Sequence, residues 1–138
     1  MSLVLDSSAT LAWIYSDEVT EGMRQLFHTV ADTGAFVPTL WRLEVANSLT
    51  IAVGRGRIDA EFRRAALDDL AMLEITTDNQ TDTHAWAETL QLADRFRLTL
   101  YDAAYLELAH RRRVPLATLD EDLSAAALAL GLNVLGGG

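Results

Sequence analysis

The stretch Leu3-Val4-Leu5-Asp6-Ser7-Ser8 joins a short apolar run to a polar helix start, and this succession decides the fold. Three consecutive apolar residues indicate a buried strand, and the acid and hydroxyl residues that follow are typical of a helix N-terminus. The same succession returns near the other end of the chain at Leu116-Ala117-Thr118-Leu119-Asp120. Strands that lead directly into helices favour a parallel sheet covered by helices, because a parallel crossover needs a long connection.

The rest of the chain alternates in the same way between short apolar runs and longer helical patterns. The expected strands are 3–5, 35–37, 74–76, 114–119 and 133–135, and the expected helices are 6–15, 20–31, 40–53, 59–73, 83–96, 100–113 and 121–130. The pattern predicts an α/β protein, a three-layer α/β/α sandwich around a mostly parallel sheet. We expect a single domain over residues 1–135, followed by a flexible glycine tail at 136–138.

Composition restricts the class of protein. The 138 residues leave room for one domain, and no apolar run approaches the roughly 20 residues that a membrane-spanning helix needs. Residues 1–15 lack a basic leader and carry Asp6 within their apolar part, so they do not resemble a signal peptide, and we expect a cytoplasmic protein. The absence of cysteine excludes disulfides, thiolate nucleophiles and zinc–thiolate sites.

The charged residues also narrow the chemistry. Twenty acids against 11 bases give a net charge of −9, which argues against broad coating of nucleic acid. It does not exclude nucleic-acid chemistry at a metal-filled pocket, because bound divalent cations reverse the local field. Every base is an arginine, so Schiff-base chemistry, lysine general bases and P-loop phosphate sites are excluded.

Three acids stand at the starts of expected helices. Asp6 and Asp120 each follow a strand, and the carboxyl ends of parallel strands form one edge of a sheet, where ligand sites gather. Asp102 shares the inward face of its helix with Tyr105. Each acid also has a purely structural interpretation, since Asp6 and Asp120 fit helix N-caps and Asp102 fits a capping box with Thr99.

Glu44 is placed differently. It lies inside the expected helix 40–53, too far in to be a cap, and that helix is apolar nearly all round, which is typical of a buried helix. A buried glutamate without a partner would cost several kcal/mol or become protonated. No lysine exists to pair with it, and the nearest arginine by helical spacing is Arg55. A metal ion is therefore the expected partner, with a glutamate extending to solvent from the helix edge as the alternative.

Four carboxylates at one edge would repel one another strongly unless cations lay among them. Oxygen ligands suit hard ions, so we expect Mg²⁺, with Mn²⁺ as a substitute. Asp122 can reach the same place from the first helical turn, although an acid there also simply favours a helix N-terminus. The expected ligands are Asp6, Glu44, Asp102, Asp120 and Asp122, and Ser8, Asn47 and Thr118 are expected to orient the ligands or a water.

The run Arg111-Arg112-Arg113 is the one dense basic segment. Its ordinary interpretation is a helix C-terminus whose positive charges complement the helix dipole. The alternative is a patch that contacts RNA phosphates.

Four segments together resemble the motifs of PIN-domain ribonucleases, and most closely the VapC type, the toxin half of toxin–antitoxin pairs. They are VLDSS at 4–8, WRLEVAN at 41–47, YDAAY at 101–105 and LATLDED at 116–122. The resemblance implies an α/β/α sandwich, dependence on Mg²⁺ or Mn²⁺, cleavage of single-stranded RNA, and a homodimer neutralised by a small DNA-binding antitoxin. It places Asp6, Glu44, Asp102 and Asp120 on the acidic positions of the family, and Asp122 on a less constant fifth one.

The hypothesis is therefore metal-assisted hydrolysis of an RNA phosphodiester, in which no side chain acts as a covalent nucleophile. Two alternatives stay open. One is an aspartyl-phosphate phosphotransferase, because Asp6-Ser7-Ser8-Ala9-Thr10 superficially resembles the haloacid-dehalogenase phosphatases, although those use a lysine that this chain lacks. The other is a non-catalytic module whose acidic crevice accepts a basic peptide.

Overall fold

A five-stranded parallel sheet forms the centre of the molecule in the computed structural model, which describes residues 2–15 and 19–137. The strands lie in the order β3-β2-β1-β4-β5, and every pairing is parallel. Val4 is paired with Phe36 on one side and with Leu116 on the other. The strands are β1 (Val4–Leu5), β2 (Ala35–Val37), β3 (Ile75–Thr77), β4 (Leu116–Ala117) and β5 (Val134–Leu135). The predicted α/β class is confirmed.

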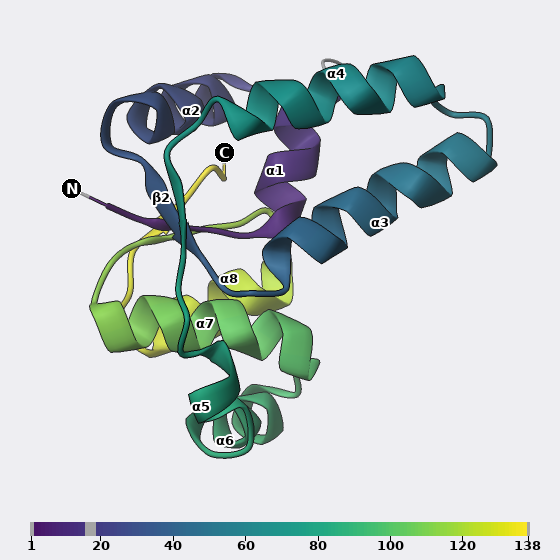
Figure 1. The fold of residues 1–138 in the computed structure, drawn as a ribbon. Helices are drawn as coiled ribbons and strands as arrows, with labels where there is room; N and C mark the ends of the chain where they lie inside the picture. The colour runs from purple at the N-terminus through teal and green to yellow at the C-terminus, as the bar shows by residue number, and fades with distance from the viewer. Residues whose placement is uncertain (1, 16–18, 138) are drawn as a thin grey trace.

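Helices cover both faces of this sheet (Figure 1). One face carries α1 (Ser7–Ile14), α2 (Glu21–Thr33), α3 (Trp41–Gly54) and α4 (Ala60–Ala71). On the other face lie α7 (Leu100–Arg112) and α8 (Glu121–Ala129), and α5 (Thr81–Ala85) and α6 (Glu88–Phe96) pack against α7 on its side away from the sheet. The three-layer arrangement is confirmed, and α3 and α4 extend beyond the sheet as an arm of two helices.

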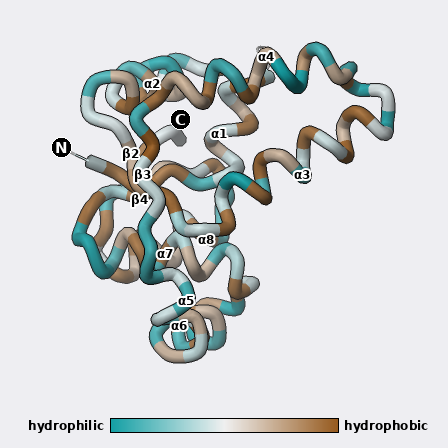
Figure 2. The backbone as a smooth tube through the Cα atoms, in the orientation of Figure 1, coloured by the Kyte–Doolittle hydropathy of each residue, from teal (hydrophilic) through white to brown (hydrophobic). Residues whose placement is uncertain are grey.

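The core lies where the apolar strands meet one side of each neighbouring helix, as the colouring by hydropathy shows (Figure 2). Both residues of β1 and both of β4 are fully buried. Gly34 forms the tight connection from α2 to β2 at a φ of 74°, and a Cβ atom there would lie 2.6 Å from the carbonyl oxygen of Glu74. Only glycine allows both the positive φ and this close approach to the neighbouring strand.

One predicted helix is wrong in its extent. The expected helix 83–96 is two helices, because the backbone leaves the helical conformation at Ala87, between α5 and α6. Trp86 lies at this break with 91% of its surface exposed. The apolar period does not encode the bend, which lets α6 pack along α7.

Strand 114–119 is also shorter than predicted. The Val114 N–H still bonds to the Ala109 carbonyl oxygen at the end of α7, and Pro115 has no N–H to donate to a sheet. The strand β4 therefore begins only at Leu116.

Two predictions concern terminal residues that lie outside the described residues. One is Met1, which begins the segment 1–15 that does not resemble a signal peptide, and the other is Gly138, which ends the predicted glycine tail at 136–138. Across 2–15 and 19–137, no helix has the length and apolar content to cross a membrane.

Candidate active site and metal centre

The candidate site begins at the point where β1 and β4 end side by side. From β1 the chain crosses to β2 on one side of it, whereas β4 lies on the other side, so the order of the strands reverses here. Such a reversal leaves a crevice at the carboxyl edge of a parallel sheet, where ligands bind. Asp6 follows β1 and Asp120 follows β4, so both predicted acids lie at this crevice.

Asp6 is almost completely buried there, with 3% of its surface exposed. It is the N-cap of α1, and its Oδ1 accepts hydrogen bonds from the Ala9 N–H at 3.0 Å and from the Ser8 hydroxyl at 2.7 Å. Its Oδ2 accepts a hydrogen bond from the Thr118 hydroxyl at 2.5 Å. The predicted polar neighbours Ser8 and Thr118 therefore fix both carboxylate oxygens.

The environment of Asp6 disfavours its charged form. Burial raises the pKa of Asp6 from 3.8 to about 6, and the negative charge of Asp102 adds to this rise. The hydrogen bonds from Ala9, Thr118 and Ser8 act in the opposite direction but do not cancel the cost of burial. A carboxylate that is held in place yet costly to ionise is typical of a site that receives a positive charge.

Asp102 lies partly buried in the first turn of α7. Its N–H donates a hydrogen bond of 3.1 Å to the hydroxyl of Thr99, the N-cap of that helix. Burial raises the pKa of Asp102, and so do the negative charges of Asp120, Glu44 and Asp122. Acids from four different helix starts therefore lie close enough for their charges to act on one another.

Asp120 and Asp122 approach from the start of α8. Asp120 is the N-cap of this helix and accepts a hydrogen bond of 2.8 Å from the Leu123 N–H. Its own N–H donates to the Thr118 hydroxyl at 3.1 Å, so Thr118 connects Asp120 to Asp6. Asp122 is exposed in the first turn. Asp6 and Asp120 thus act as helix caps and also belong to the group of gathered acids, so the two interpretations do not exclude each other.

The prediction for the helix of Glu44 is wrong. The helix α3 begins at Trp41, so Glu44 lies in its first turn and is partly exposed. The helix buries only one stripe of residues, and Leu43 keeps 76% of its surface exposed, because α3 leaves the sheet to form the arm with α4. Nor does Glu44 lack a protein partner, since its Oε1 accepts a 2.6 Å hydrogen bond from the Tyr105 hydroxyl. The case for a cation therefore depends on the gathered charges and not on a buried, unpartnered glutamate.

Tyr105 is a residue of the site that the sequence placed on the face of Asp102 without assigning it a role. It is fully buried one turn after Asp102 on α7. Burial raises its pKa far above the usual range, and the hydrogen bond to Glu44 and the charges of Glu44 and Asp6 raise it further. The hydroxyl therefore remains protonated and acts as a hydrogen-bond donor to Glu44. The signal available in the sequence was the spacing of three residues from Asp102.

The acids approach one another without converging on one point. In the described parts of the chain, no three acidic or histidine side chains lie close enough together to hold a metal ion as they stand. The predicted ligand set, with Asp122 included, therefore stays a prediction. Asn47, predicted to orient ligands, is exposed one turn beyond Glu44 on α3.

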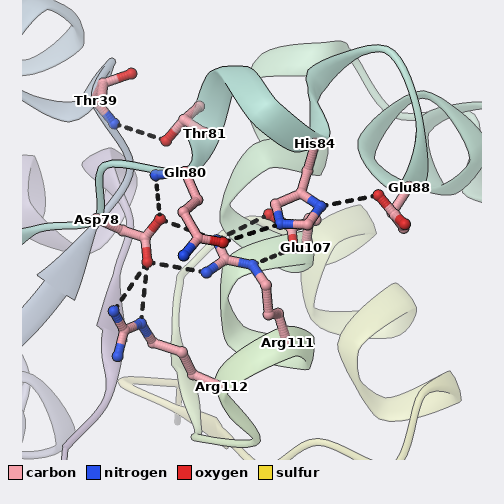
Figure 3. Close-up of polar contacts among 9 residues, drawn as sticks. All are labelled: Thr39, Asp78, Gln80, Thr81, His84, Glu88, Glu107, Arg111 and Arg112. Atoms are coloured by element: carbon pink, nitrogen blue, oxygen red, sulfur yellow. Dashed lines mark hydrogen bonds and ion pairs between the residues drawn. The ribbon is translucent and has the colours of Figure 1, made fainter.

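Two residues of the run 111–113, Arg111 and Arg112, take part in a second polar cluster (Figure 3). Arg111 and Arg112 both bind Asp78, a buried acid that follows β3, and Arg111 also binds Glu107. Arg113 ends α7 in the left-handed conformation and is exposed. RNA contact by this run stays a prediction, but two of its members have partners within the protein. Asp78 was missed, although it follows a strand as Asp6 does.

The fold and the crevice together define a parallel α/β protein with an acidic site at its topological switch point. The PIN domain family matches residues 3–128, and the chain belongs to this family, whose members are typically nucleases. No curated protein matches the chain at a significant level.

Solved structures that share the fold include the following two. The chain is similar to PAE2754 from Pyrobaculum aerophilum, with a TM-score of 0.71, 24% identity, and coverage of 97% of this chain and 83% of that one. It is also similar to FitAcB from Neisseria gonorrhoeae, with a TM-score of 0.67, 12% identity, and coverage of 99% and 97%.

Proposed function

We propose that this chain is a metal-dependent endoribonuclease that hydrolyses phosphodiester bonds of single-stranded RNA. The observation that carries the proposal is the gathering of acids at one crevice, where Asp6 and Asp102 have raised pKa values. Membership of a family whose members are typically nucleases supports a nuclease chemistry for this acidic crevice. The four motifs that resemble VapC proteins supply the finer assignment, the toxin of a type II toxin–antitoxin system.

The donor chemistry of the gathered residues suits a hard divalent cation. The gathered side chains offer only carboxylate oxygens, the donors that Mg²⁺ and Mn²⁺ prefer. A cation there would lower the raised pKa values by compensating the mutual repulsion of the acids. We propose that Asp6, Glu44, Asp102 and Asp120 hold it and that Asp122 contributes from the rim.

The protein side of the mechanism is preorganisation. Ser8, the Ala9 N–H and Thr118 fix the carboxylate of Asp6, and the Tyr105 hydroxyl orients Glu44. A bound Mg²⁺ would supply the positive charge that polarises the phosphodiester and makes water a stronger acid. Cysteine is absent, and the Ser8 hydroxyl is directed to Asp6, so hydrolysis by water fits better than a covalent enzyme intermediate.

The proposed partners follow from the same assignment. They are the RNA substrate, a small antitoxin and a second copy of the chain in a homodimer, and the proposed location is the cytoplasm. The resemblance to VapC motifs supports the RNA substrate, the antitoxin and the homodimer.

The decisive experiment compares two neutralised acids. Asp6→Asn is expected to abolish cleavage of single-stranded RNA in Mg²⁺, whereas Asp94→Asn, which neutralises an exposed acid on α6, leaves it unchanged. EDTA should abolish the activity of the unmodified chain, and Mg²⁺ or Mn²⁺ should restore it. Full activity of the Asp6→Asn variant, or cleavage that survives EDTA, would refute the proposal.

A further inference from the structure

A buried ion-pair cluster lies outside the acidic crevice, at the end of β3 (Figure 3). Asp78 is 2% exposed, and Arg111 binds it with two hydrogen bonds of 3.0 Å, one to each carboxylate oxygen. Arg112 adds bonds of 3.1 and 3.0 Å to Oδ2, and the Gln80 N–H adds one of 2.8 Å to Oδ1. Burial alone would raise the pKa of Asp78, but these bonds lower it to about 2. Asp78 therefore remains charged and tightly held.

The cluster fastens the C-terminal end of α7. Arg111 bridges Asp78 and Glu107, with bonds of 2.7 and 3.2 Å to the latter, so two acids face two guanidinium groups. The guanidinium of Arg112 also lies 4.0 Å from the centre of the Phe36 ring on β2. These contacts connect the last turn of α7 to the sheet and to the segment that follows β3.

The same segment, residues 77–81, is bonded to the region where α3 begins. The Asp78 N–H donates to the Val37 carbonyl oxygen at 2.8 Å, at the end of β2. The Thr39 N–H donates to the Thr81 hydroxyl at 3.1 Å, as Figure 3 shows, and Arg42 on α3 donates to the hydroxyl of Thr77. Residues 77–81, which we name the brace, therefore contact both the start of α3 and the end of α7.

The two helices held by the brace meet again at the candidate site. There the Tyr105 hydroxyl on α7 donates its 2.6 Å hydrogen bond to Glu44 in the first turn of α3. Tyr105 and Arg112 are seven residues apart on one helix, which corresponds to about 10 Å along its axis. A helix is stiff over this length, so its position at Arg112 determines its position at Tyr105.

We propose that Asp78 is a positioning residue, which holds α7 and α3 in the register that brings the Tyr105 hydroxyl to the Glu44 carboxylate. Through Glu44 it sets the orientation of one proposed ligand of the metal centre. The effect on the Glu44–Tyr105 pair rests on the contacts alone, and the effect on metal binding rests on the proposed function. These two parts need separate tests.

The first test uses no metal and no RNA. A double-mutant cycle of Tyr105→Phe and Glu44→Gln, measured by urea unfolding in EDTA, gives the coupling of this pair. We expect the coupling to change the unfolding equilibrium about tenfold, as for a hydrogen bond to a charged group. In an Asp78→Asn background this tenfold change in the unfolding equilibrium should shrink to about fivefold or less. In the milder Arg112→Gln background it should shrink less.

Val30→Ala provides the matched control. Val30 is fully buried on α2, on the other face of the sheet from α7, so its truncation lowers stability without touching the brace. The Glu44–Tyr105 coupling should persist in that background. An unchanged coupling in both the Asp78→Asn and the Arg112→Gln backgrounds would overturn the proposal, and so would an equal loss in Val30→Ala.

The second test measures the Mg²⁺ concentration at half of the maximal thermal shift. We expect this midpoint to rise about tenfold in Asp78→Asn, as for residues that orient metal ligands, and to stay unchanged in Val30→Ala. The kcat for RNA should fall while its KM is unchanged. Tyr105→Phe should reproduce the rise, and the double variant should show no further rise, because both changes act through Glu44. Rises that multiply would contradict the proposed route.

The two proposals fail in different ways. If the unmodified chain neither responds to Mg²⁺ nor cleaves RNA, the proposed function is refuted, and the cycle in EDTA alone decides the role of Asp78. If the chain cleaves RNA and the cycle shows no dependence on Asp78, the inference about the brace is refuted while the proposed function stands.

Discussion

Asp6→Asn should make the metal-free protein more stable while it removes activity. Asp6 has a pKa of about 6 in the folded chain and an ordinary value of 3.8 when unfolded, so between these pH values the folded state binds the proton more tightly. Stability therefore falls as the pH rises from about 4 to 6. The difference of about 2 in pKa lowers the free energy of unfolding by about 3 kcal/mol at pH 7, because each pKa unit corresponds to about 1.4 kcal/mol. Asparagine cannot ionise and avoids this cost.

The hydrogen bonds of Asp6 determine how much of that gain is kept. Asparagine is as good an N-cap as aspartate, so its amide oxygen can still accept from the Ala9 N–H. Its amide NH₂, however, stands where Oδ2 of Asp6 accepts a hydrogen bond from the Thr118 hydroxyl. That hydroxyl would have to reorient and accept a hydrogen bond from the amide. We therefore expect a net gain of about 1–3 kcal/mol in the free energy of unfolding at pH 7.5 in EDTA.

The assay is urea unfolding of both proteins, followed by circular dichroism, at pH 4 and at pH 7.5 in EDTA. The gain should be present at pH 7.5 and nearly absent at pH 4, where Asp6 is protonated in the folded state. Added Mg²⁺ should then stabilise the unmodified chain more than the variant, because the cation relieves repulsion that the variant has already lost. An Asp6→Asn protein less stable than the unmodified chain at pH 7.5 in EDTA would refute the reasoning.

Three further predictions concern other parts of the molecule. Asp78→Ala should lower the free energy of unfolding by about 3–4 kcal/mol in urea at pH 7, because it leaves two guanidinium groups short of a partner. The pKa of Asp78 is lowered to about 2 in the folded chain, so its contribution to stability is complete above about pH 4 and is lost as the pH falls through 2. The variant should therefore lose less stability than the unmodified chain between pH 4 and pH 2. Gly34→Ala should lower the free energy of unfolding by about 2 kcal/mol or more in the same assay, because alanine would be strained at a φ of 74° and its Cβ would lie 2.6 Å from the Glu74 carbonyl oxygen. A loss of less than about 0.5 kcal/mol would contradict the assigned turn. Thr118→Val should raise the pKa of Asp6 further and weaken the Mg²⁺ thermal shift at pH 7, with a smaller loss at pH 8.5; an equal loss at both pH values would refute the link to protonation.

Features encoded by neighbouring residues could be predicted from the sequence. The strand 35–37 has the predicted bounds, and Asp6 and Asp120 cap helices as their positions before apolar periods indicated. The parallel sheet follows from the alternation of strands and helices, and its carboxyl edge brought Asp6 and Asp120 together without knowledge of the strand order.

Features that depend on distant parts of the chain could not be predicted in this way. Glu44 is partly exposed because α3 departs from the sheet, and the composition of the helix does not record where it goes. Asp78 is buried because Arg111 and Arg112 bind it from 33 and 34 residues away, and no local pattern links them. The break at Ala87 likewise serves the packing of α6 along α7 and leaves no mark in the apolar period.

Asp120 is both a helix cap and a member of the acidic group, so one substitution can remove its charge while it preserves the fold. Because asparagine caps a helix as well as aspartate does, an Asp120→Asn chain keeps the start of α8 and its contact with the Leu123 N–H while it loses one negative charge. If Asp120 holds the cation as proposed, such a chain would keep its fold and bind RNA without cleaving it. Under the proposed function, cross-linking of this variant to RNA, followed by sequencing, would identify the preferred target.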